Sequence, residues 1–528
     1  MYKLINVKEK PVELEKRISS YWLKNNIAIK SEDVREGSQK FIFFEGPPTA
    51  NGMPGIHHVI SRALKDVVCR YKTMRGFQVK RKAGWDTHGL PVEIEVQKEL
   101  GFTVKKEIED YGIEKFNQKC RESVFTYEKE WREMTNLLGY WLDMDNPYIT
   151  LTNDYIESVW WLLNQFWNKG MIYEDNKIVA FCPSCGTPLS SHEVALGYDE
   201  TEDPSIFVKF KVKNEENTYF LAWTTTPWTL ISNVALVVHP EYEYVKIQTE
   251  KEYLILAKAR LDTIKEKYSV VDEYKGSELE NIEYEQLFPF IIPDKKAFFV
   301  VPGTYVTMED GTGIVHTAPA FGEDDYKTGK KYDLPFTQPV NEQGKFTDEI
   351  TDWAGIFVKD ADKDIIHNLK DRGLLYHREQ IKHTYPFCWR CNSPLIYFAR
   401  NSWYIKTTAF ADKMKENNAK IKWYPKYVGE KRFGDWLDNN IDWAISRDRY
   451  WGTPLNIWVC ENCKTQDSPD SIKSLIKKGK MLDGSPVSDN IELHRPYVDD
   501  IEFTCPKCGG KMHRTPEVID CWFDSGAM

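Results

Sequence analysis

The sequence has 528 residues, with 70 lysines and arginines against 80 aspartates and glutamates, which gives a formal net charge of −10. The 41% hydrophobic and 28% charged fractions are typical of a soluble globular chain, and at about 150 residues per domain the length predicts three or four domains. No apolar stretch approaches the roughly 18 residues of a transmembrane helix and the charged N-terminus does not look like a signal peptide, so we expect a cytoplasmic protein without a membrane partner.

The first predicted unit is strand, helix, strand. Residues 41–48 (FIFFEGPP) read as an apolar strand that ends in Gly-Pro, and a turn-rich loop follows. A helix is expected from about Ile56 to Tyr71, where apolar residues recur at helical spacing, and 77–84 reads as a second strand. Two strands joined through a helix in this way are expected to pair in parallel.

The pattern of apolar and charged residues then changes twice along the sequence. Residues from about 105 to 170 are charged with helical spacing and predict packed helices. After the first cysteine pair, short β-like runs such as SIFVKFKV and AFFVVPG continue to roughly residue 380, and an α/β texture then returns. We therefore predict an α/β fold whose parallel-sheet domain is interrupted by a β-rich insertion.

Eight of the eleven cysteines form Cys-x-x-Cys pairs. In a chain without an export signal, this spacing indicates thiolate ligands for metal rather than disulfides, and Zn²⁺ suits four thiolates. Alternatively, the paired cysteines are reduced thiols without a metal-binding role, or they are redox motifs. The pairs are Cys182 with Cys185, Cys388 with Cys391, Cys460 with Cys463, and Cys505 with Cys508.

The spacing of the pairs suggests how they combine. The last two are separated by a short polar segment, as in a zinc ribbon at about 456–515. The first two would then meet at the base of the insertion, which requires its two ends to lie side by side. Alternatively, each of these pairs recruits His192 or His383 to form its own site.

The loop after the first strand is the first chemical site. A helix N-terminus offers free N–H groups to phosphate, glycines permit close backbone approach, and histidines can donate to a phosphoryl group. Two adjacent histidines can equally be structural. The residues concerned are Gly46, Pro47, Pro48, Asn51, Gly52, Gly55, His57 and His58.

Residues 45–93 resemble the opening of class I aminoacyl-tRNA synthetases of the isoleucine, leucine and valine group, and PPTANG (47–52) and GWDTHGLPVE (84–93) are most similar to isoleucyl members. The resemblance implies a Rossmann-like catalytic domain, a β-rich editing insertion and two small zinc modules. It also implies an isoleucine–tRNA ligase that uses ATP with Mg²⁺, tRNA(Ile) and two structural Zn²⁺ ions, and we expect a monomer. Further matches follow in family order: FCPSCGTPLSSHEVA (181–195), AWTTTPWTL (222–230), GTGIVHTAPAFGEDD (311–325), HTYPFCWRC (383–391), SRDRYWGTP (446–454) and DCWFDSG (520–526).

The chain departs from the family signature His-x-Gly-His, because it reads Gly55-Ile56-His57-His58. In the family, the glycine lets adenine lie against the backbone and both histidines hold the ATP phosphates. Either activity is impaired here, or the loop is shifted so that His57 replaces the lost histidine, which we favour. The pattern resembles a variant class of bacterial isoleucyl enzymes that resist the antibiotic mupirocin.

Further roles are implied by the resemblance. Asp86 would pair with the substrate ammonium group, although it could instead cap the following helix. Pro47 and Trp522 would form walls of the isoleucine pocket, although Trp522 could be a core residue. In the editing insertion, the three threonines would surround the ester, His316 would exclude isoleucine and Asp325 would bind the free ammonium group. The implied editing residues are Thr224, Thr225, Thr226, Asn233, His316 and Asp325.

The expected boundaries are a first catalytic half at 1–197, an editing domain at 198–384, and a return to the catalytic domain with the zinc ribbon at 385–528.

A basic stretch from Val67 to Trp85 could contact tRNA phosphates, or it could be a solvent-exposed face without a partner. The family's Lys-Met-Ser-Lys-Ser loop and anticodon-binding domain are not found in the sequence, so we interpret it as the front part of a longer synthetase. A free-standing hydrolase of mischarged tRNA and a tRNA-binding module without chemistry are the alternatives.

Overall fold

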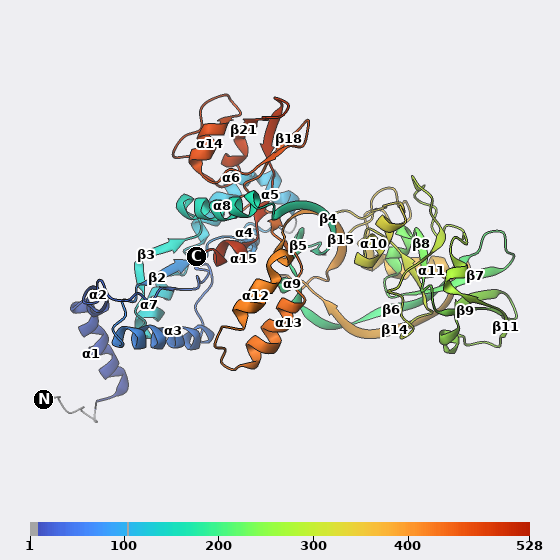
Figure 1. Ribbon diagram of the computed structural model, residues 1–528, viewed down its shortest axis with the longest axis horizontal. Coiled ribbons are helices and arrows are strands. Elements are labelled where there is room, and N and C mark those ends of the chain that lie inside the picture. Colours follow the sequence, from blue (N-terminus) through green and yellow to red (C-terminus); the bar gives the residue numbers. More distant parts are fainter. Residues whose placement is uncertain (1–8, 103–104) are drawn as a thin grey trace. The chain divides into compact units, whose positions relative to one another are not determined.

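The computed structural model describes residues 9–102 and 105–528, apart from the side chain of His192 (Figure 1). The chain divides into two compact units, Met1–Tyr173 with Trp403–Met528, and Glu174–Ser402. The predicted interruption of one domain by an insertion is thus confirmed, whereas the functional boundaries given above stay predictions. Within the described residues, no helix is both long and apolar enough to cross a membrane.

The first unit contains a parallel sheet in the order β1, β2, β3. Strand β1 (Phe43–Phe44) pairs in parallel with β2 (Arg81–Trp85), and α3 (His57–Met74) connects them, as predicted. Strand β3 (Asp143–Ile149) pairs in parallel with the other edge of β2. The expectation of helices alone between 105 and 170 is therefore wrong at β3, because a strand without clear alternation forms here by pairing with β2, a partner far away in sequence.

Helices and short strands complete this unit. Its helices are α1 (Pro11–Lys24), α2 (Ile27–Asp33), α4 (Leu90–Leu100), α5 (Lys105–Tyr111), α6 (Ile113–Ser123), α7 (Glu128–Leu137), α8 (Asn153–Asn168), α12 (Ala411–Asn418), α13 (Phe433–Asp438), α14 (Ile472–Lys478) and α15 (Cys521–Gly526). Strands β16 (Trp443–Ala444), β17 (Ser446–Arg447) and β23 (Val518–Ile519) are short. A five-stranded antiparallel sheet forms the ribbon module, in the order β19 (Gln466–Asp467), β18 (Trp458–Cys460), β22 (Lys511–Arg514), β21 (Ile501–Thr504), β20 (Gly479–Met481).

Helix α3 presents its apolar residues outward. Ile60 is 70% exposed and Leu64 64% exposed, whereas Arg62, Cys69 and Thr73 form the buried face. The buried face is held by hydrogen bonds, among them one of 2.7 Å from Arg62 to the hydroxyl of Thr135 on α7. The helical spacing thus predicted the helix but not the side that packs against the described part of the chain.

The second unit is built on a nine-stranded sheet (Figure 1, green to orange). Its central path runs β11 (Ser269–Lys275), β9 (Glu243–Gln248), β10 (Tyr253–Ala257), β7 (Thr218–Thr224), β13 (Ile314–Thr317), β8 (Ala235–Val238), β12 (Phe299–Pro302). Strands β6 (Tyr198–Lys211) and β14 (Leu375–Pro386) form a long antiparallel pair, which joins the path where β6 pairs with β7. The β-rich character of the insertion is therefore confirmed.

A large apolar core lies within this second unit, including Phe210, Phe220 and Ile255 from the sheet and Ile365 from α11 (Val358–Asp371). The remaining elements are β4 (Ile172–Cys182), β5 (Thr187–Leu189), α9 (Ser191–Ala195), α10 (Glu323–Lys331) and β15 (Ile396–Ile405). The chain crosses between the two units within β4 and β15.

Candidate functional site

The loop between β1 and α3 is fixed by backbone hydrogen bonds. Tyr127 N–H donates to the carbonyl of Ala50 at 3.0 Å, and the indole of Trp131 donates to the carbonyl of Gly52 at 2.8 Å. At its start, the carbonyl of Pro48 accepts the amide of Asp86 at 3.0 Å. The glycine- and proline-rich loop thus lies next to the loop that follows β2, at the carboxyl ends of two parallel strands, where α/β sheets bind ligands.

The altered signature has a defined packing. The rings of His57 and His58 lie 3.8 Å apart, and His58 Nδ1 accepts the amide of Gly55 at 2.9 Å. A β-carbon at position 55 would come within 2.7 Å of His57 Cε1, so the imidazole of His57 fills the space next to Gly55. Burial, followed by the neighbouring His57, lowers the pKa of His58 below its ordinary value.

Asp86 follows β2 directly. Among the described residues, its carboxylate has one hydrogen bond, from the amide of His88 at 3.5 Å. Although the residue is partly accessible, desolvation and then the charge of Asp524 raise the pKa of Asp86 to about 8. Helix α4 begins with Gly89 as its N-cap, so the alternative that Asp86 caps this helix is excluded. The side chain is a desolvated acid that has no cation beside it in the described structure.

Helix α15 approaches this loop closely. Gly89, at φ 93°, allows the approach, because a β-carbon there would lie 2.7 Å from Cβ of Cys521. Asp524 on α15 is fully buried, and its Oδ2 lies 2.7 Å from Nδ1 of His88. Trp522 is the second residue of the same helix and is 42% exposed, so it is not a core residue. Helix α15 and the Asp86 loop therefore adjoin.

In the second unit, Thr224 is the last residue of β7, and Thr225 and Thr226 follow it. Thr224 Oγ1 accepts the amide of Thr226 at 3.1 Å, and the two hydroxyls lie 3.3 Å apart. Thr225 is half-buried and accessible. A contact with α11 stabilises the turn, because the Asp362 carboxylate accepts a hydrogen bond from the amide of Trp228 at 2.9 Å. The segment therefore holds a group of hydroxyls in a fixed arrangement.

Thr229 connects this turn to His316. Its hydroxyl donates to the carbonyl of Thr226 at 2.7 Å, so the His316 Nε2 atom 3.1 Å away has to be the donor to Thr229. Burial lowers the pKa of His316 to about 4, which keeps this ring neutral. Its Nδ1 is buried without a hydrogen bond to the described residues. Thr229 lies within the AWTTTPWTL segment, but nothing in the sequence distinguishes it from an ordinary threonine of that segment.

Asp325 and Asn233 differ in the hydrogen bonds that their side chains already form within the protein. Desolvation raises the pKa of Asp325 to about 7, although its carboxylate accepts the amide of Ala318 at 2.9 Å. Asn233 donates to the carbonyl of Ala235 at 2.9 Å and accepts the hydroxyl of Tyr284 at 2.7 Å, so its amide is already bonded within the sheet. The roles of both residues stay predictions.

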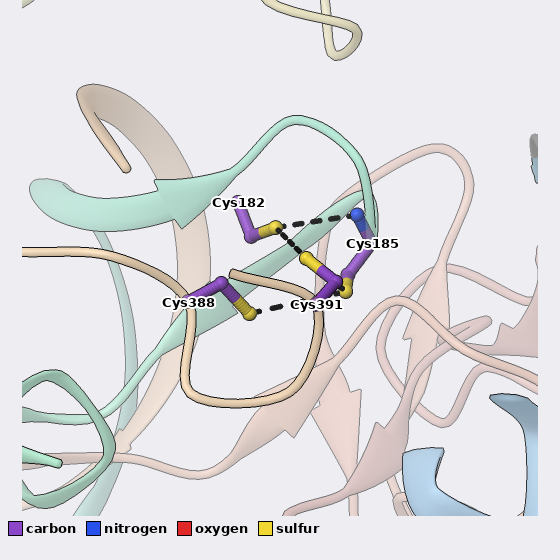
Figure 2. A group of neighbouring side chains, drawn as sticks. All are labelled: Cys182, Cys185, Cys388 and Cys391. Carbon is purple, nitrogen blue, oxygen red and sulfur yellow. Dashed lines mark hydrogen bonds between the residues drawn. The ribbon is translucent and has the colours of Figure 1, made fainter. Parts of the chain in front are cut away.

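The first cysteine group brings together two pairs that are almost two hundred residues apart in sequence. Figure 2 shows Cys182 and Cys185 facing Cys388 and Cys391. Sulfur separations of 3.4 Å for Cys182 to Cys391 and 3.9 Å for Cys185 to Cys388 match the roughly 3.8 Å edge of a tetrahedral zinc thiolate site. His383 instead contacts Asp203 at 3.0 Å, so the alternative involving His383 is excluded, and the His192 side chain lies outside the described structure.

The second group lies in the ribbon module. Cys460 and Cys508 have sulfurs 3.5 Å apart, and those of Cys463 and Cys505 are 3.6 Å apart. In each of the two groups, all four sulfurs lie within 4.8 Å of one another. The predicted pairing of the pairs is therefore confirmed, and both groups can hold a metal ion of the zinc type.

The basic residues predicted between Val67 and Trp85 include both exposed and buried side chains. Lys80 and Lys82 are exposed, but Arg81 is 2% exposed and donates to the hydroxyl of Thr73 at 2.7 Å. Arg81 therefore does not belong to an exposed patch, because β2 turns its side chain inward toward α3.

A second basic segment, 413–432, was not identified from the sequence. It has seven lysines or arginines against two glutamates, and exposed rings accompany them, including Tyr424 at 89% and Tyr427 at 61%. The segment runs from α12 to η5 (Val428–Arg432), and Figure 1 shows it in orange. Basic side chains interleaved with aromatic rings are typical of surfaces that bind single-stranded nucleic acid.

The parallel sheet, the loop at its carboxyl edge and the two cysteine groups define a class I synthetase catalytic domain with an inserted β-rich unit. A model of the family described as tRNA synthetases class I (I, L, M and V) matches residues 17–528, and the chain belongs to this family.

Among curated proteins, the chain is 55% identical over 528 residues to "Isoleucine--tRNA ligase" of Clostridium acetobutylicum, with 100% of this chain and 50% of that protein covered. It is 53% identical over 527 residues to "Isoleucine--tRNA ligase 2" of Bacillus cereus, again with 50% of that protein covered. The chain thus spans about half the length of these relatives. A solved complex titled Agrobacterium radiobacter K84 agnB2 LeuRS-tRNA-LeuAMS has 17% identity and a TM-score of 0.38, with 97% of this chain and 58% of that one covered, too low to support an argument.

Proposed function

We propose that this chain supplies the amino-acid-activating and editing parts of an isoleucine–tRNA ligase. Isoleucine would react with ATP to give isoleucyl-adenylate and pyrophosphate, and the isoleucyl group would then pass to tRNA(Ile) with release of AMP. The family match and the names of the relatives support this proposal.

The observation that carries the proposal is the carboxyl group of Asp86. Its raised pKa reflects burial beside Asp524 without a cation, so a bound ammonium group would both compensate its charge and restore its ionisation. The PPTANG loop adjoins through the hydrogen bond from the Asp86 amide to Pro48. With Pro47 and Trp522 as pocket walls, the substrate carboxylate would be aimed toward the phosphates bound at the loop.

Activation would proceed by attack of the isoleucine carboxylate oxygen on the α-phosphorus of ATP, and the bond to pyrophosphate would break. Catalysis would come mainly from positioning and charge stabilisation. Mg²⁺ would accompany the phosphates. The ATP-binding set would be Gly46, Pro48, Asn51, Gly52, Gly55, His57 and His58.

In the altered signature, His57 would replace the histidine that is missing at position 55. The packing of its ring against Gly55 supports this proposal, because the ring fills the space where a side chain at position 55 would begin. His58, held by the Gly55 amide, would keep the second position of the family signature. The altered ATP site is also the basis for proposing resistance to mupirocin, which competes for this site.

The second unit would hydrolyse mischarged Val-tRNA(Ile). One missing methylene in an apolar pocket is worth only about 1–3 kcal/mol, a magnitude known from isoleucine enzymes themselves, so valine is activated too often. Thr224, Thr225 and Thr226 would orient the ester and water, and Asp325 would bind the valine ammonium group. His316, held by Thr229, would leave room for valine but not for isoleucine.

Each cysteine group would hold one structural Zn²⁺ ion. Four thiolates at tetrahedral spacing without an open position suit a structural rather than a catalytic zinc site. The first ion would join the two ends of the inserted unit, and the second would hold the ribbon. We also propose a monomer that works in the cytoplasm.

Isoleucine-dependent ATP–pyrophosphate exchange tests the activation proposal, and hydrolysis of Val-tRNA(Ile) tests the editing proposal. The full-length isoleucine–tRNA ligase of Clostridium acetobutylicum, of which this chain covers 50%, is the positive control. The Asp86→Asn variant is the negative control for ATP–pyrophosphate exchange. Hydrolysis without exchange, even in a chain of full length, would favour the free-standing hydrolase. Binding of tRNA without either reaction would favour a module without chemistry.

A further inference from the structure

The hydroxyl group of Thr229 has three polar neighbours in the second unit. It lies 2.7 Å from the carbonyl oxygen of Thr226, 3.1 Å from the hydroxyl of Thr226 and 3.1 Å from Nε2 of His316. Thr229 is 6% exposed and belongs to η1 (Pro227–Ser232), a short helix whose residues are all buried. The hydroxyl is therefore surrounded by protein groups.

The distances decide which group donates in each of these contacts. Two oxygen atoms 2.7 Å apart need a hydrogen between them, and a carbonyl has none, so the Thr229 hydroxyl donates to the carbonyl of Thr226. This uses its only hydrogen. The lone pairs of Thr229 must then make the other two contacts, and they accept from Nε2–H of His316 and from the hydroxyl of Thr226.

These three contacts use the full hydrogen-bonding capacity of the Thr229 hydroxyl, which is one donor and two acceptor positions. No position is left for an ester or an attacking water. Thr225 differs in this respect, because its side chain is accessible. Thr229 can therefore influence a reaction at this site through Thr226 and His316, but not by binding the reacting groups with its own hydroxyl.

The contact with Thr229 also fixes the tautomer of His316. A neutral imidazole carries one N–H, and because Nε2 donates to Thr229, Nδ1 carries no hydrogen. The opposite tautomer would place an N–H at Nδ1, which is buried without a hydrogen-bond partner among the described residues, and a buried donor without an acceptor is costly. His316 is 7% exposed, so one tautomer and one ring orientation are favoured.

We propose that Thr229 is a positioning residue of the editing site: its hydroxyl holds the His316 ring in one orientation, joins it to Thr226, and thereby limits the size of the amino acid that is hydrolysed. This proposal rests on the editing function proposed above. Without the hydroxyl, the ring loses its one side-chain hydrogen bond within the described structure and can rotate, so that a larger side chain can enter. We therefore expect selectivity to be lost more than rate.

Hydrolysis of Ile-tRNA(Ile), compared with that of Val-tRNA(Ile), tests this role. Thr229→Val keeps the shape of the side chain but removes the hydroxyl. We expect it to increase the rate for Ile-tRNA(Ile) relative to Val-tRNA(Ile) by about tenfold, a factor typical of one methylene in an apolar pocket. Thr229→Ser keeps the hydroxyl and should keep the wild-type selectivity.

Thr263→Val is the matched control. Thr263 is 8% exposed, and its hydroxyl likewise donates to the carbonyl three residues earlier, that of Arg260, at 2.7 Å. It ends η2 (Lys258–Thr263) and has no hydrogen bond to His316. Thr263→Val should therefore leave the selectivity unchanged, although it removes the same kind of local hydrogen bond.

A double variant separates positioning from direct contact with the substrate. If Thr229 acts through the His316 ring, Thr229→Val should change selectivity little once His316→Ala has removed that ring, so the two effects should not add. Additive effects would show that Thr229 itself blocks isoleucine, and would overturn the proposal. Unchanged selectivity in Thr229→Val, or an equal loss in Thr229→Ser and Thr229→Val, would also overturn it.

Nitrogen NMR of histidine-labelled protein reports the tautomer without tRNA or activity. The wild-type signals that are lost in His316→Ala should show a protonated Nε2 and an unprotonated Nδ1 at pH 7, and Thr229→Val should show a mixture of tautomers. A protonated Nδ1 in the wild type would overturn the proposal. If the wild-type chain does not hydrolyse Val-tRNA(Ile), the proposed editing function is overturned, and the role of Thr229 in selectivity with it, even if the tautomer is observed.

Discussion

The imidazole of His57 lies against the α-carbon of Gly55, in a place that a side chain at position 55 would need. A β-carbon there would come within 2.7 Å of Cε1 and 2.8 Å of Nδ1 of His57. The two departures from the family signature are therefore coupled: the loss of a side chain at position 55 makes room for the ring gained at position 57. A substitution at one of these positions should depend on the residue at the other.

Swapping the residue types at positions 55 and 57 tests this coupling. The double change Gly55→His with His57→Gly recreates the family signature and should increase sensitivity to mupirocin, whereas Gly55→His alone should impair ATP–pyrophosphate exchange because two imidazoles compete for one space. We expect an interaction energy of about 1 kcal/mol or more between the two changes. Inhibition constants and exchange rates measure it, with Met53→Ala in the same loop as control. An unchanged inhibition constant in the double variant would contradict the proposed basis of resistance.

Isoleucine binding should strengthen as pH rises. The pKa of Asp86 is raised to about 8 in the free site, so below pH 8 a proton must leave before the ammonium group can bind. We expect affinity to rise about tenfold per pH unit between pH 6 and 7 and to level off above pH 8. Equilibrium titration measures this slope and the released proton.

The Asp86→Asn variant should bind isoleucine weakly at every pH and should release no proton. A wild-type affinity that is flat between pH 6 and 8 would show that Asp86 is already ionised, and would count against the uncompensated carboxyl as the ammonium partner.

The parallel unit, the inserted β-rich unit and the cysteine pairing are predictable from the sequence, because they depend on local periodicity and on ligand spacing that chemistry restricts. Strand β3 is not predictable in this way, because its formation depends on pairing with β2 rather than on its own alternation. The contacts of His88 with Asp524 and His494 are not predictable either, although His88 and Asp524 lie within the GWDTHGLPVE and DCWFDSG motifs. Partners separated by more than four hundred residues are set by the tertiary fold, which spacing along one sequence does not reveal.

Editing should depend on Thr225 and Asp325. Thr225→Ala removes an accessible hydroxyl, and Asp325→Asn removes the carboxylate for the valine ammonium group, so each should slow Val-tRNA(Ile) hydrolysis by about tenfold to hundredfold. Thr351→Ala, at an exposed threonine of the same unit, is the control. Because desolvation raises the pKa of Asp325 to about 7, hydrolysis should increase from pH 6 to pH 8. Full hydrolytic activity in both variants would refute the assignment of this site.

Two zinc ions per chain are expected. Cys182→Ser and Cys460→Ser should each reduce the zinc content by one equivalent, because each removes a thiolate from a different tetrahedral group. Chelation should lower the thermal midpoint, since metal bound only to the folded state stabilises it. Metal analysis and calorimetry measure both effects. Cys521→Ser, outside both groups, should retain two zinc ions, and its loss of zinc would indicate that the variants unfold rather than lose a ligand.

The basic segment 413–432 should contribute to tRNA affinity. No ion pair with a described acid is found for Lys420, Lys422 or Arg432, whereas Lys426 is paired with Glu430 at 2.5 Å. Changing the three unpaired residues to glutamate should weaken tRNA binding and reduce its dependence on salt, because fewer counterions are released from the phosphates. Lys426→Ala is the matched control and should have a smaller effect. A salt dependence identical to that of the wild type would show that these charges form a solvated face, in which case the exposed rings of Tyr424 and Tyr427 would have no nucleic-acid partner at this surface.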